Sequence, residues 1–177
     1  MFDAPYKFRY ISSSSKGNDH SESEVHRFTF YGKKNLCYIV EAEQFHCDFF
    51  ILGFYLERDE NKGTNEKYGL RSYLYDTSRV LATCVQIMKQ LYQKNSKSSF
   101  GFIGTPSVDD QKDLDLANTK RYRVYSQLMA NVVSPDSFQH YADKERSMYL
   151  LINRSQSKEL LGEMTEFLLS RWNSLDD

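Results

Sequence analysis

The feature that most constrains the fold is a change in the spacing of apolar residues at Asp76. From this point apolar side chains recur on one helix face, at Val80, Leu81, Cys84, Val85, Ile87, Met88, Leu91 and Tyr92. A period of about 3.6 residues is typical of an amphipathic helix. Asp76, Thr77 and Ser78 are suitable residues to cap its start, and the polar run 95–98 ends it. The chain is therefore expected to contain a long helix that begins near Asp76.

The segment before Asp76 has the alternating pattern of β-strands instead. Residues 25–31 and 36–44 predict a hairpin, because a polar turn with one glycine separates them. Residues 47–57 form a longer apolar run, which favours a strand buried on both faces, and residues 68–75 alternate imperfectly. Together these segments predict an antiparallel meander of four strands. The polar run 11–24, with four successive serines, predicts a mobile loop.

Shorter elements follow the long helix. We expect a buried strand at 100–103, a loop at about 105–117 and a helix from about Thr119 that Pro135 ends. Further expected elements are a hairpin or one broken strand over 138–153 and a last helix over 157–172. The predicted fold class is α/β (α+β), with a mostly antiparallel twisted sheet of about six strands and three helices. A chain of 177 residues fits one domain, 1–177.

Composition limits the classes of function. The formal net charge is −1, so no global field attracts nucleic acid or an anionic membrane, and a nucleic-acid partner is not favoured. The longest apolar run, 49–56, is far shorter than the roughly 20 residues that span a bilayer. Three widely spaced cysteines fit a reducing compartment, and we expect a soluble, cytoplasmic protein.

Motifs for metal binding and hydrolysis are weak. The acidic run at Asp109, Asp110, Asp113 and Asp115 lacks the order of a calcium-binding loop, and the four histidines form no zinc motif. We therefore predict no metal site. A nucleophile elbow of the Gly-x-Ser-x-Gly type is also missing from the sequence.

Chemistry is suggested only at residues 118–125, where Asn118, Lys120, Arg121, Arg123 and Tyr125 begin the second helix. Arginine forks at a helix start favour a phosphate or carboxylate ligand. The alternative is a solvated basic face that balances the acidic run before it.

The predicted element order resembles the middle and end of the GNAT acyltransferase fold, and Asn118 and Tyr125 stand at the seven-residue spacing of a GNAT motif. The resemblance implies that Asn118 helps to hold the pantetheine arm of acetyl-CoA and that Tyr125 protonates the leaving thiolate. Lys120, Arg121 and Arg123 would then be cofactor-binding residues. The glycine-bearing phosphate loop of the family has no counterpart, because 76–82 reads Asp-Thr-Ser-Arg-Val-Leu-Ala. The arrangement of Arg121 and Tyr125 also resembles small uncharacterised proteins of Bacteroidota.

Two functions follow as hypotheses. The first is a non-catalytic binding module that contacts a protein partner or a small anionic ligand through the face of the 118–127 helix, as a bacterial accessory or defence-system component without a cofactor. The second is a divergent GNAT-like N-acyltransferase that uses acetyl-CoA, with Tyr125 as its catalytic residue. Self-association into a homo-oligomer is left open by the sequence.

Overall fold

The computed structural model describes residues 4–17, 23–69, 76–104, 117–156 and 162–167. Within these residues, seven strands form one sheet in the order β1-β2-β3-β4-β5-β7-β6. Their bounds are Phe8–Lys16 (β1), Ser23–Tyr31 (β2), Cys37–Phe45 (β3), Phe49–Leu56 (β4), Ser99–Ile103 (β5), Phe138–Asp143 (β6) and Met148–Asn153 (β7). Only β4 and β5 pair in parallel among these strands, and every other neighbouring pair is antiparallel.

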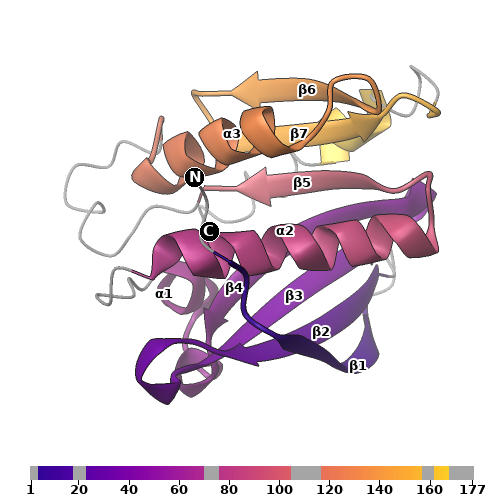
Figure 1. Cartoon of the computed structure of the whole chain (residues 1–177). Helices are drawn as coiled ribbons and strands as arrows, with labels where there is room; N and C mark the ends of the chain where they lie inside the picture. The colour runs from indigo at the N-terminus through magenta and orange to yellow at the C-terminus, as the bar shows by residue number, and fades with distance from the viewer. Residues whose placement is uncertain (1–3, 18–22, 70–75, 105–116, 157–161, 168–177) are drawn as a thin grey trace.

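Two long helices lie on one face of this sheet (Figure 1). They are α2 (Thr77–Lys94), which connects β4 to β5, and α3 (Lys120–Val132), which connects β5 to β6. The apolar stripe predicted from the sequence is the buried face of α2, and it packs on Phe28, Val40 and Phe100, which are fully buried. The long central helix, the short strand after it and the hairpin 138–153 are therefore confirmed.

The second face of the sheet carries a smaller apolar cluster. Met164, in the helical segment 162–167, packs there with Phe49, Met148, Leu150 and Ile152. A short helix, α1 (Thr64–Gly69), lies against β4. Single 3-10 turns occupy Lys33–Asn35, His46–Asp48 and Glu57–Asp59.

The structure corrects three sequence predictions. The described part of the sheet has seven strands rather than about six, because the serine run expected to be a loop pairs with β2 as far as Lys16. Tyr68, expected to begin a fourth strand of the meander, lies in α1, and residues 70–75 lie outside the described residues. With α1, the described residues also hold more helices than the three predicted. Residues 105–116 of the expected loop and most of the expected last helix lie outside them as well.

Candidate functional site

Strands β4 and β5 separate halfway along β4. Their parallel ladder runs from the pair Phe49 and Ser99 to the pair Leu52 and Phe102. Beyond Leu52, the described ladders pair β4 only with β3. The place where the strands part is lined by side chains of both strands, α2 and α3, namely Leu52, Gly53, Phe54, Leu81, Cys84, Phe102, Tyr125, Leu128 and Met129. They enclose a cavity of about 10 Å³, enough for roughly one water molecule.

The start of α3 is fixed at this place by Thr119. Its hydroxyl donates to the carbonyl oxygen of Gly104 at 2.7 Å and accepts from the amide of Tyr122 at 3.2 Å. Its own amide donates to Ser147 Oγ at 2.9 Å. Thr119 thus caps the helix and ties it to the end of β5 and to the β6–β7 turn.

Gly104 permits this arrangement. A Cβ atom there would lie 2.7 Å from the Tyr122 amide nitrogen and 2.7 Å from Thr119 Oγ1. Asn118, just before Thr119, has a left-handed backbone with φ 53°. Its amide donates to the Lys144 carbonyl oxygen at 2.7 Å.

The structure brings together two of the five predicted site residues. Tyr125 is buried and lines the cavity, with its ring centroid 6.1 Å from that of Phe102. Arg121 is half-buried, and its guanidinium carbon lies 5.9 Å from the centroid of the Phe54 ring. Burial raises the pKa of Tyr125 to about 12, although the positive charge of Arg121 acts to lower it. The phenol is therefore neutral near pH 7.

The other three predicted residues lie elsewhere on the helix start. Lys120 and Arg123 are exposed, and Arg123 donates to the carbonyl oxygen of Asn118 at 2.7 Å. Arg123 therefore helps to hold the turn before α3. The aspartates proposed to balance these cations lie outside the described residues.

Asp76, at the start of α2, is committed to internal contacts. It is 1% exposed, and its carboxylate accepts from the Tyr6 hydroxyl at 2.8 and 2.9 Å and from the Lys33 amide at 3.2 Å. Arg79 covers the ring of Tyr6 at 3.8 Å and donates to the Ala4 carbonyl oxygen. The carboxylate thus joins the N-terminal segment, the β2–β3 turn and α2.

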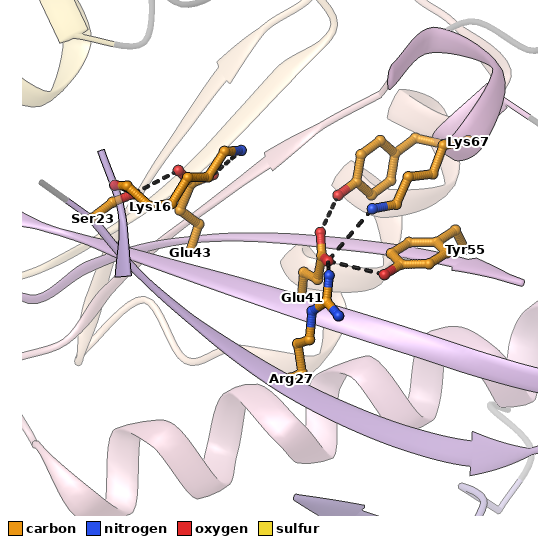
Figure 2. A network of polar contacts seen from close by, with 8 residues as sticks. Lys16, Ser23, Arg27, Glu41, Glu43, Tyr55 and Lys67 are labelled. Atoms are coloured by element: carbon orange, nitrogen blue, oxygen red, sulfur yellow. Dashed lines mark hydrogen bonds and ion pairs between the residues drawn. The ribbon is translucent and has the colours of Figure 1, made fainter. Parts of the chain in front are cut away.

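A second polar cluster, which the sequence reasoning missed, lies on the other face of the sheet and is centred on Glu41 of β3 (Figure 2). The donors to its carboxylate are Arg27 Nη2 at 2.8 Å, the Tyr55 hydroxyl at 2.9 Å, Lys67 Nζ at 3.5 Å and the Tyr68 hydroxyl. Two residues along β3, Glu43 accepts from Ser23 Oγ at 2.8 Å and pairs with Lys16 at 3.8 Å. The only signal in the sequence is the pair of acidic residues inside a predicted strand.

Burial and the charges in this cluster shift its pKa values. Burial raises the pKa of Glu41, but the Tyr68 hydroxyl, the Lys67 ammonium and the Tyr55 hydroxyl outweigh it, so the pKa lies below 4.5. Burial and the charge of Glu41 raise the pKa values of Tyr55 and Tyr68 well above 10. The carboxylate is therefore ionised and both phenols are neutral at pH 7.

Two further reactive groups of the described residues, the Cys84 thiol and the His140 imidazole, lie within the packed fold. Burial raises the pKa of the Cys84 thiol to about 12, which disfavours a thiolate. His140 Nδ1 lies 2.8 Å from the Tyr149 hydroxyl, and burial lowers the pKa of His140. No three His, Cys, Asp or Glu side chains of the described segments gather as metal ligands.

Comparison with known proteins found no match to a family model, to a curated protein or to a solved structure. None of the described helices is long and apolar enough to cross a membrane.

Proposed function

We propose that the chain is a binding module for a small anionic ligand, which Arg121 contacts beside the cavity where β4 and β5 part. The observation that carries this proposal is that, one turn apart on α3, Arg121 lies over Phe54 of β4 and Tyr125 lines the cavity between β4 and β5. In open sheets ligands bind outside the carboxyl ends of parallel strands, where the chain connections diverge. The described β4–β5 pair is the parallel pair of this sheet.

The chemistry of this place suits a carboxylate or phosphate. A guanidinium presents a planar fork that binds either group through two hydrogen bonds. Arg121 is half-buried, so water screens its charge less than the charges of the exposed Lys120 and Arg123. Cations in the first turn of a helix oppose its dipole at a cost of about 0.3–1 kcal/mol each, which a bound anion offsets. An accessory or defence role in a bacterium stays a prediction from the resemblance.

Charge reversal at single positions tests the proposal. Arg121→Glu should weaken binding of pyrophosphate or citrate at least tenfold in calorimetry, whereas Lys120→Glu and Arg123→Glu, matched in charge change, should weaken it less than about threefold. Equal losses in all three variants would indicate a diffuse basic surface, and an unchanged Arg121→Glu variant would refute the assignment. Co-purification from the native host with wild-type and Arg121→Glu chains extends the test to an acidic protein partner.

N-acyl transfer from acetyl-CoA is the second candidate. The observation that favours it is that α2, β5, α3 and two strands follow the strands β1 to β4, although these are not the four strands expected from the sequence, since Tyr68 lies in α1. A neutral phenol at the cavity, Tyr125, suits a proton donor to a thiolate. Two features argue against this candidate. The cavity is too small for acetyl-CoA, and the Asp76 carboxylate at the start of α2 would repel its phosphate groups.

Thermal shift with acetyl-CoA and CoA separates the two candidates. A ligand at 100 times its Kd stabilises a protein by about 2.7 kcal/mol. If the chain only binds a small anion, acetyl-CoA and CoA should stabilise it no more than pyrophosphate does at the same concentration, and Tyr125→Phe should leave pyrophosphate binding within about threefold. Under the second candidate both compounds stabilise the chain, and Tyr125→Phe abolishes turnover.

A further inference from the structure

The ammonium group of Lys67 lies inside a small polar and aromatic enclosure on the second face of the sheet (Figure 2). Its Nζ atom is 3.5 Å from Glu41 Oε1, 3.9 Å from the centroid of the Tyr55 ring and 5.3 Å from that of the Tyr68 ring. The two rings meet edge to face, with centroids 5.5 Å apart. A carboxylate combined with aromatic faces is the chemistry by which proteins recognise ammonium ligands.

The charges of the enclosure favour one cation beside Glu41. Arg27 donates to Glu41 and to Glu60, each at 2.8 Å, so one guanidinium serves two carboxylates. Without Lys67 these three groups carry an excess of one negative charge. Burying an uncompensated charge is costly, and only 14% of the Glu41 side chain is exposed. A cation at the position of Lys67 Nζ therefore stabilises the Glu41 carboxylate, whereas the charge of Glu60, which is 37% exposed, is also screened by water.

The enclosure does not depend on Lys67 for its shape. Tyr68 packs directly on Gly53 of β4, where a Cβ atom would lie 2.8 Å from its ring, and its hydroxyl donates to Glu41. Tyr55 belongs to β4 and Glu41 to β3, so both are held by the sheet. Lys67 precedes Tyr68 on α1, so its ammonium group leaves the enclosure by rotation of its own flexible four-carbon side chain, while α1 and Tyr68 stay in place.

We propose that Glu41, Tyr55 and Tyr68 form a binding site for a primary alkylammonium group, which Lys67 occupies in the unliganded chain and which an external ligand takes in its place. The ligand is a lysine side chain of a partner or a free small amine. This site lies on the opposite face of the sheet from Arg121 and is independent of the anion-binding function proposed above.

Removing the internal occupant tests this directly. Lys67→Met retains an apolar stem without the charge, and n-butylammonium is the probe, with n-butanol and matched sodium chloride as controls. We expect saturable binding of butylammonium by the Lys67→Met variant, at least tenfold tighter than by wild type. Addition of Glu41→Gln should abolish it. If the folded Lys67→Met variant binds butylammonium no better than butanol, the proposal is wrong and the cluster only docks α1.

A measurement on the wild-type chain covers the case in which Lys67→Met does not fold. Acetylation of Lys67 by a neutral reagent, measured by mass spectrometry relative to acetylation of the exposed Lys33, should rise severalfold when butylammonium displaces Lys67. The ratio corrects for reagent that the amine probe itself consumes, and an unchanged ratio at saturating probe would overturn the proposal. Nα-acetyl-lysine amide distinguishes the source of the ligand: stronger displacement by it than by butylammonium indicates a lysine side chain, and the reverse indicates a small amine.

Discussion

Thr119 shows how one side chain can place a candidate site. Its hydroxyl contacts β5 through Gly104 and α3 through Tyr122, while its amide contacts the β6–β7 turn through Ser147. The side chain is buried, so water cannot replace these bonds when they are lost. The position of Arg121 and Tyr125 relative to β4 therefore depends on the cap of the helix that carries them.

Thr119→Ala should lower the free energy of unfolding by about 1–3 kcal/mol, because it leaves the Tyr122 amide and the Gly104 carbonyl oxygen without the Thr119 hydroxyl as their partner. Urea denaturation at pH 7 measures this loss. Thr119→Ser keeps the hydroxyl and is the matched control, with an expected loss below about 1 kcal/mol. A Thr119→Ala variant as stable as wild type would show that the cap contributes nothing.

Gly104→Ala should destabilise the fold by about 1–3 kcal/mol, since the added methyl group meets backbone at 2.7 Å and cannot be relieved by a rotamer change. Gly63→Ala is the control, because a Cβ atom there meets nothing within 4 Å and its effect should stay within about 0.5 kcal/mol. Thermal and urea unfolding of both variants measure the difference. Similar stabilities of the two would contradict the close approach of β5 and α3.

Glu41→Gln should cost about 2–4 kcal/mol at pH 7, because a buried carboxylate with four donors loses its charge. The folded pKa of Glu41 is lowered, so its contribution is present above the ordinary pKa near 4.5 and is lost as the pH falls through the folded value. The stability gap between wild type and Glu41→Gln should therefore shrink in acid. Urea denaturation from pH 7 to pH 3 measures it, and a constant gap would argue against an ionised Glu41.

At the scale of elements, the sequence predicted the segments whose local pattern matches their packing in the fold. The stripe of α2 and the start of α3 at Thr119 were predictable because their local signals, apolar spacing and a cap residue, agree with their tertiary contacts. The shared face of Arg121 and Tyr125 follows from their spacing of four residues. Which strand this face meets was not predictable, because it depends on the register of β4 and β5.

The elements that were missed lack a local signal. Strand β1 is almost wholly exposed at the sheet edge, so its serines need no alternation of apolar and polar residues. Tyr68 was expected to begin a strand because residues 68–75 alternate imperfectly, but it lies in α1 and its ring packs on Gly53. The Glu41 cluster combines residues of β2, β3, β4 and α1, which only the sheet register brings together.

At the scale of the whole molecule, one buried thiol reports on opening of the helical layer. Cys84 of α2 lines the cavity and is only 5% exposed, and burial raises the pKa of its thiol to about 12. Cys84 should therefore react with a thiol reagent only when α2 leaves the sheet, at a rate that falls with stability. Peptide mapping identifies the alkylated cysteine, and half-buried Cys37 is the internal comparison. Equal rates at the two thiols in native buffer would contradict this packing.

The parallel pairing of β4 with β5 also has a consequence for the kinetics of folding. Strands β1 to β4 meet their neighbours through short connections, whereas Phe49 pairs with Ser99, across the whole of α1 and α2. Closing so long a loop costs chain entropy before any contact repays it. We therefore expect the meander to form early and the β4–β5 junction, like the equally distant β5–β7 pair, to close late, so that the place where β4 and β5 part leaves water after the meander does during synthesis of the chain.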